Sequence, residues 1–98
     1  MDINKQLNTA IETGKVIFGS NKTIDEVLTA EPKMVILSRN CPPKQRESIK
    51  YYCALSETPY VTIKDSSLEL GSAIGRSHLI STVCILDEGE STILEVQK

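Results

Sequence analysis

The chain has 98 residues, of which 40% are hydrophobic and 24% charged, and its net charge is −2 at neutral pH. These proportions are typical of a folded globular protein and exclude a disordered chain, and the length predicts a single domain over residues 1–98. The negative net charge argues against a protein that coats nucleic acid with its whole surface, but it allows a local basic patch. The sequence contains no apolar run long enough to span a membrane and no amino-terminal secretory signal pattern, so we expect a cytoplasmic protein.

Residues that commonly carry catalysis or bind metals are few and scattered. His78 is the only histidine, and the sequence offers no third group to orient it in a catalytic triad. Cys41, Cys53 and Cys84 are odd in number, and their spacing fits neither a disulfide framework nor a C-x-x-C zinc site. We therefore expect reduced thiols, no metal, no cofactor and no enzymatic activity.

The first predicted elements are a helix and a short strand. Asp2 is a suitable N-cap, and apolar residues then recur at helical spacing, which predicts a helix over residues 2–13. Gly14 fits the left-handed residue that ends many helices. The apolar run at residues 16–18 follows it and predicts a strand that is buried on both faces.

The second helix can begin at either of two places. Thr23 and Glu26 have the spacing of a capping box, which would place the helix start at Thr23. A start at Ser20 would instead place Asn21 and Lys22 in the first helical turn. A fully apolar run at residues 34–37 then predicts a second buried strand.

A third helix is predicted from Pro43 to about Glu57, because proline suits the first turn of a helix. Its inward face is expected to consist of Ile49, Tyr52, Cys53 and Leu55. The polar residues on its early face are interpreted as an ordinary solvated surface. They are Lys44, Gln45, Arg46 and Lys50.

The carboxyl-terminal third of the chain repeats the same alternation. Residues 60–63 predict a strand, and Ser66 with Glu69 forms a capping box that opens a short helix ending at Gly75. Residues 80–86 predict a fourth apolar strand, residues 87–91 an acidic turn, and residues 92–96 a short final strand at a sheet edge. This order predicts a three-layer α/β/α sandwich, with helices covering a central mixed sheet of four to five strands.

Residues 19–22, Gly-Ser-Asn-Lys, join an expected buried strand directly to a helix. The first N–H groups of a helix have no partner within it, and the helix dipole favours negative charge there. Gly19 allows close approach because it has no Cβ, Asn21 can donate hydrogen bonds, and Lys22 adds a positive charge. The junction therefore suits a phosphate group, although most polar strand-to-helix turns only cap a helix.

Three loops are expected to form one surface: loop 19–22, loop 39–42 and loop 75–78. If the first two strands are parallel, the first two loops lie at the same sheet edge, where α/β proteins usually bind ligands. The third loop joins them if the short helix runs back toward that edge. The combined polar set is a suitable RNA-binding surface. It contains Asn21, Lys22, Arg39, Asn40, Arg76, Ser77 and His78.

Several segments together resemble the L-thirty-e family of large-subunit ribosomal proteins of archaea and eukaryotes. They are Arg39-Asn40-Cys41-Pro42, residues 49–55 (IKYYCAL), residues 69–71 (ELG) and residues 87–91 (DEGES). Gly14-Lys15 and residues 19–22 fit as well, so the likeness extends from about residue 7 to residue 94. The short length resembles the archaeal members.

The resemblance implies a structural constituent of the large ribosomal subunit that binds and stabilises kink-turn ribosomal RNA and contacts neighbouring ribosomal components. It implies RNA contacts from Gly19, Ser20, Asn21, Lys22, Arg39, Asn40, Arg76, Ser77 and His78. Superfamily relatives that serve guide or processing particles carry an acidic residue where this chain has Lys22, so Lys22 indicates the ribosomal branch. The free protein is expected to be a monomer. A protein-interaction module of the same fold, without specific RNA binding, is the alternative.

Overall fold

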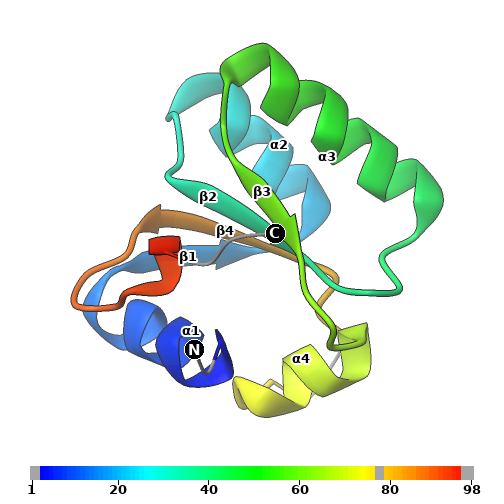
Figure 1. The fold of residues 1–98 in the computed structure, drawn as a ribbon. Helices are drawn as coiled ribbons and strands as arrows, with labels where there is room; N and C mark the ends of the chain where they lie inside the picture. Colours follow the sequence, from blue (N-terminus) through cyan, green and yellow to red (C-terminus); the bar gives the residue numbers. More distant parts are fainter. Residues whose placement is uncertain (1–2, 77–78, 96–98) are drawn as a thin grey trace.

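Helices and strands alternate four times along the chain in a computed structural model that describes residues 3–76 and 79–95 (Figure 1). The elements are α1 (Ile3–Thr13), β1 (Lys15–Phe18), α2 (Ser20–Thr29), β2 (Met34–Leu37), α3 (Pro43–Ser56), β3 (Tyr60–Thr62), α4 (Ser67–Ala73), β4 (Thr82–Asp87) and a 3₁₀ turn, η1 (Ile93–Glu95). The four strands form one mixed sheet in the order β1-β4-β2-β3. β4 is antiparallel to both β1 and β2, whereas β2 and β3 are parallel.

The sheet lies between two helical layers, with α1 and α4 on one face and α2 and α3 on the other (Figure 1). Side chains alternate between the faces of a strand. In β2, Met34 and Ile36 join the core under α1 and α4, while Val35 and Leu37 join the core under α2 and α3. All four residues of this strand are buried, as their apolar run predicts, and the three-layer α/β/α sandwich is confirmed.

The first strand is covered on both faces, as predicted, but its side chains are only partly buried. β1 is an edge strand that pairs only with β4, and Val16, Ile17 and Phe18 are each partly exposed. A short apolar run shows that both faces of a strand are covered, but not where the strand lies in the sheet. Phe18 at the end of β1 thus remains accessible beside the loops at this edge.

Gly14 ends α1 for a reason other than the predicted left-handed conformation, which it does not adopt. A Cβ at this position would collide with the carbonyl oxygen of Asp87 and lie 2.7 Å from the nitrogen of Gly89. Glycine is therefore needed because the backbone of the acidic turn passes directly against the end of α1. The turn itself forms as predicted, with Gly89 at φ 61°.

The second helix begins at Ser20, so Asn21 and Lys22 lie in its first turn. The capping box of Thr23 and Glu26 is wrong, because Thr23 is fully buried inside the helix. In α3, Ile49 and Cys53 are buried and Tyr52 is partly buried, but Leu55 is 63% exposed and does not face inward.

The predicted final strand over residues 92–96 is also wrong, since residues 93–95 form η1. Side chains occupy the backbone donors that a strand would need for pairing. The N–H of Thr92 donates to Oε1 of Gln6 at 2.9 Å, and the N–H of Ile93 donates to Oγ of Ser91 at 3.0 Å. The segment consequently folds onto α1 and buries Ile93 in the core.

Candidate nucleic-acid interface

The start of β4 holds the ends of β1 and β2 together. The N–H of Gly19 donates to the carbonyl of Thr82 at 3.1 Å, and the N–H of Ser38 donates to the carbonyl of Ser81 at 2.9 Å. Because β4 is antiparallel to both neighbours, β1 and β2 run parallel and end at the same edge of the sheet. The prediction that loop 19–22 and loop 39–42 share an edge is confirmed.

Gly75 and Arg76, the described part of loop 75–78, reach the same edge through a tight end to α4. Gly75 has φ 76°, its N–H donates to the carbonyl of Ser72, and the N–H of Arg76 donates to the carbonyl of Gly71 at 2.8 Å. This pair of bonds is a Schellman motif, which fixes the exit direction of the chain. Arg76 then lies over the ring of Phe18, with its guanidinium carbon 4.5 Å from the ring centroid. The predicted contributions of Ser77 and His78 lie outside the described residues.

In loop 19–22 the polar groups are open to solvent. Gly19 is the N-cap of α2 at φ 105°, and no atom lies within 4 Å of a Cβ built there. Ser20 is partly exposed, and Asn21 and Lys22 are exposed. Among the described residues, the side chains of Asn21 and Lys22 form no hydrogen bond or ion pair, so both are available to a ligand.

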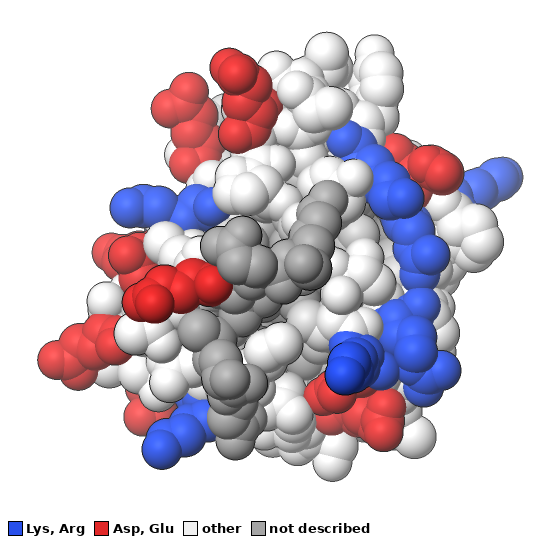
Figure 2. All heavy atoms as spheres, viewed as in Figure 1, with Lys and Arg blue, Asp and Glu red and all other residues white. Residues whose placement is uncertain are grey.

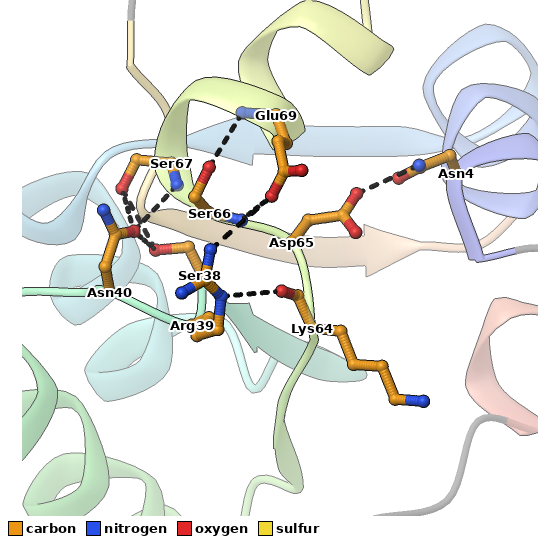
Figure 3. Close-up of polar contacts among 9 residues, drawn as sticks. All are labelled: Asn4, Ser38, Arg39, Asn40, Lys64, Asp65, Ser66, Ser67 and Glu69. Carbon is orange, nitrogen blue, oxygen red and sulfur yellow. Dashed lines mark hydrogen bonds and ion pairs between the residues drawn. The ribbon is translucent and has the colours of Figure 1, made fainter.

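Arg39 is tied to the segment that leads into α4 (Figure 3). Its Nε donates to the carbonyl of Lys64 at 3.0 Å, and its Nη2 lies 3.8 Å from Oε1 of Glu69. The hydrogen bond that Glu69 accepts from the backbone of Ser66, together with the nearby Arg39, lowers the pKa of the Glu69 carboxyl. The Arg39 side chain is still 63% exposed, so it both braces the loop and faces solvent.

Arg46 also belongs to this edge, although the sequence analysis assigned it to a solvated helix face. Its Nη2 donates to the carbonyl of Arg39 at 2.8 Å, and the side chain is partly buried. Arg46 lies three residues after Pro43, in the first turn of α3. Residues in the first turn of a helix lie beside the preceding loop, so this position could have indicated a contact with loop 39–42. Arg46 thus stabilises loop 39–42 through a hydrogen bond to its backbone.

The amide oxygen of Asn40 is the centre of a hydrogen-bond cluster (Figure 3). It lies 2.8 Å from both the backbone nitrogen and Oγ of Ser67, and 3.3 Å from Oγ of Ser38. The Ser67 hydroxyl is also 2.8 Å from Oγ of Ser81. These contacts connect the carboxyl end of β2, the first residue of α4 and Ser81, the residue before β4. They therefore hold this edge of the sheet together.

A cavity of about 220 Å³ opens at this edge of the sheet. It is lined by Phe18, Gly19, Gln45, Leu79, Ile80, Ser81 and Thr82. The floor is largely apolar, while Arg76 lies beside it on Phe18. A planar group with apolar faces and a charged backbone is the chemistry that such a site accommodates.

Residues 1–95 match the sequence model of the ribosomal protein L7Ae/L30e/S12e/Gadd45 family. The chain belongs to this family. Among curated relatives, the large ribosomal subunit protein eL30 of Methanocaldococcus jannaschii is 45% identical over 96 residues, covering 98% of this chain and 87% of the relative. The eL30 proteins of Methanopyrus kandleri and Pyrobaculum calidifontis are 40% and 44% identical and cover 95% and 98% of this chain, which spans 85% and 95% of their lengths.

The fold is also found in a protein of unknown function from Bacillus halodurans, with a TM-score of 0.75 over 94% of this chain and 89% of that one. At 21% identity this likeness concerns the fold alone. The three eL30 relatives are named as ribosomal subunit proteins and not as enzymes, which agrees with the expected lack of catalytic activity.

Positive side chains of this family member gather on the side of the candidate interface. Figure 2 shows lysine and arginine side chains running down the side where α3 and α4 begin, while most acidic side chains visible in that view lie toward the opposite side. The sequence of helix α3 includes Lys44, Arg46 and Lys50. A chain with a net charge of −2 thus has a locally basic side.

The cysteines are free, buried and part of the core under α2 and α3. Burial raises the pKa of Cys53 to about 11 and that of Cys84 to about 12. Cys41, beside the interface, is only 3% exposed and donates to Oε1 of Gln45, so it packs beneath the loop. Among the described residues no group of three or more metal-binding side chains comes together, and no helix there is long and apolar enough to cross a membrane.

Proposed function

We propose that this chain is a structural constituent of the large ribosomal subunit, where it binds and stabilises a kink-turn in ribosomal RNA. The RNA would contact the surface formed by loops 19–22, 39–42 and 75–78, and neighbouring ribosomal components would surround it. The observation that carries this proposal is the pairing of β4 with β1 and β2, which brings loops 19–22 and 39–42 to one edge. The names of the eL30 relatives support the ribosomal assignment.

A sharp bend in RNA needs what this edge contains. Bending crowds phosphates and unstacks bases, and both effects cost free energy that a protein must offset. Lys22 and Arg76 supply positive charge that is not neutralised by an ion pair among the described residues. The open start of α2 adds unpaired N–H groups, and the apolar cavity can cover an unstacked base.

The residues divide into two kinds of contribution. Asn21 and Lys22 have free side chains and would meet RNA directly. Arg39 is bonded to Lys64, before α4, and Asn40 to Ser67, the first residue of α4, so both would contact RNA only with the groups that remain exposed. Ser77 and His78 complete the proposed surface from loop 75–78.

A gel-shift comparison of a kink-turn oligonucleotide with a straight duplex of equal length tests the proposal. We expect a clear preference for the bent RNA. Asn21→Ala should weaken kink-turn binding more than duplex binding. The reason is that an amide is uncharged and forms directional hydrogen bonds, which depend on the shape of the RNA. Equal binding of the wild-type chain to both RNAs would contradict the proposal and favour a protein-interaction module.

A further inference from the structure

We propose that Ser67 is a positioning residue for RNA recognition, which holds the amide oxygen of Asn40 so that Asn40 presents only its NH₂ group to the RNA. The inference rests on the proposed function and deepens it, because it assigns the chemistry of one contact. The partner of Asn40 would be a hydrogen-bond acceptor, such as a phosphate oxygen or a base acceptor.

The orientation of the Asn40 amide follows from the donors around it. A backbone N–H can only donate, and the nitrogen of Ser67 lies 2.8 Å from Oδ1 of Asn40. Reversing the amide would place the NH₂ group against this N–H, two donors face to face, and would orphan a helix N–H. The oxygen must therefore face Ser67.

The hydroxyl groups strengthen the same orientation. The Ser67 hydroxyl lies 2.8 Å from Oδ1 of Asn40, and the Ser38 hydroxyl lies 3.3 Å from it. Ser81 can donate to Ser67, which leaves the Ser67 proton for Asn40. Ser38 is fully buried and Ser67 is only 4% exposed, so water does not compete for these contacts.

The remaining half of the amide has no partner among the described residues. Asn40 is exposed, and Figure 3 draws no hydrogen bond from its amide nitrogen to the residues shown there. No hydrogen bond of Nδ2 is formed with the other described residues. An oriented amide whose oxygen is already occupied can only donate, and a fixed donor binds without first losing rotational freedom.

The decisive test exchanges the donor for an acceptor of equal shape. Asn40→Asp keeps an oxygen for Ser67 but directs a second carboxylate oxygen outward. We expect its affinity for the kink-turn oligonucleotide to fall by about tenfold or more, while its melting temperature stays at or above that of the wild type. Asn40→Ala should show the reverse balance, with a smaller loss of affinity and a lower melting temperature.

Added negative charge alone would weaken RNA binding, so the matched control is Ser66→Asp. Aspartate is also a good N-cap. At position 66 it places one negative charge next to Ser67 in the sequence without contacting Asn40. This variant should lose only about two- to threefold in affinity. If Asn40→Asp binds as well as wild type, or loses no more than Ser66→Asp, the donor role of Asn40 is overturned.

The role of the Ser67 hydroxyl is tested separately. Ser67→Ala should weaken kink-turn binding several-fold, and Ser67→Thr, which keeps the hydroxyl, should restore it. Ser66→Ala weakens the same helix start by removing its cap, yet it should leave RNA affinity unchanged. Equal affinities of Ser67→Ala and Ser66→Ala would overturn the positioning role. Failure of the wild type to prefer the kink-turn would overturn the proposed function itself, which is a distinct outcome.

A spectroscopic measurement keeps the inference testable if a variant does not fold. In ¹⁵N-labelled wild-type protein, the side-chain NH₂ signals of Asn40 should shift when the kink-turn oligonucleotide is added. Asn8 provides the internal control, because its NH₂ group already donates to the carbonyls of Asn4 in α1 and Ala73 at the end of α4. Unshifted Asn40 signals at saturating RNA would exclude the proposed contact.

Discussion

The guanidinium group of Arg76 stacks on the ring of Phe18, with 4.5 Å between its central carbon and the ring centroid. This contact joins the end of β1 to the loop after α4, two segments that lie far apart in the sequence. It also places a positive charge beside the cavity, whose lining includes Phe18. Phe18 is therefore expected to position Arg76 without contributing charge of its own.

Replacing Phe18 by leucine should separate the effect of the position of Arg76 from the effect of its charge. Phe18→Leu removes the cation–π contact, worth about 0.5–1 kcal/mol, and should weaken kink-turn binding by a few-fold with an unchanged salt dependence. Arg76→Ala should weaken binding and also reduce the slope of log affinity against log salt. Filter-binding titrations at several salt concentrations measure both quantities. A reduced slope in Phe18→Leu would show that the ring affects more than the position of Arg76.

Lys22 is expected to contact a phosphate. Lys22→Ala should weaken binding to kink-turn and duplex RNA alike and reduce the salt slope by about one. Lys15→Ala is the matched control, because Lys15 begins β1 at the opposite edge of the sheet and is also exposed. An unchanged slope in Lys22→Ala, or an equal loss in Lys15→Ala, would contradict a specific contact.

Elements whose signals are local could be predicted from the sequence. The capping box of Ser66 and Glu69 is present as expected, with both of its hydrogen bonds formed. The apolar run of β2 also forms a buried strand. Both features depend on residues within a few positions of one another, so the pattern contains the whole physical cause.

The errors arose where distant residues decide the outcome. The final strand is replaced by η1 because Gln6, in α1, occupies the backbone donor of Thr92. The exposed edge position of β1 depends on the strand order, which no local pattern encodes. In the candidate site, the sequence predicts roles for Arg39 and Asn40, but it does not reveal that Lys64 and Ser67 already bond to them.

Gly14 should tolerate substitution poorly, because it lies at the close contact between α1 and the acidic turn. Gly14→Ala forces a Cβ against the backbone of residues 87–89 and should destabilise the fold by about 2–3 kcal/mol or more. Gly75→Ala has open space around its Cβ and pays only for φ 76°, about 1–2 kcal/mol. Urea unfolding of the two variants measures the difference. Equal losses would mean that the turn moves away at little cost.

The buried thiols should resist modification until the protein unfolds. Burial raises the pKa of Cys53 to about 11 and of Cys84 to about 12, so both remain neutral and unreactive at pH 8. Because the folded pKa values exceed those of the unfolded chain, these groups favour folding below about pH 8.5 and lose that contribution as pH rises toward 11–12. Ellman titration with and without urea checks the reactivity. Rapid labelling of the folded protein would contradict the burial.

Glu69 should give a small acid-dependent contribution to stability. Its pKa is lowered chiefly by the hydrogen bond from the backbone N–H of Ser66, so the ionised form is favoured in the folded state. A lowered folded pKa means that the contribution is present above the unfolded value and is lost as pH falls through the folded value. Wild type should therefore be more stable than Glu69→Gln at pH 7, and the gap should close as the pH falls below the ordinary pKa range of a glutamate carboxyl.

Urea unfolding of both proteins across this range measures the gap, with Glu12→Gln, which makes the same charge change on the exposed side of α1, as the control. A gap that stays constant with pH would assign the effect to helix geometry and not to ionisation. The same variant also removes the partner of Arg39, whose Nη2 lies 3.8 Å from the carboxylate. If Glu69→Gln binds the kink-turn more tightly than wild type at pH 7, and this difference disappears at low pH, the release of Arg39 makes its guanidinium available to RNA.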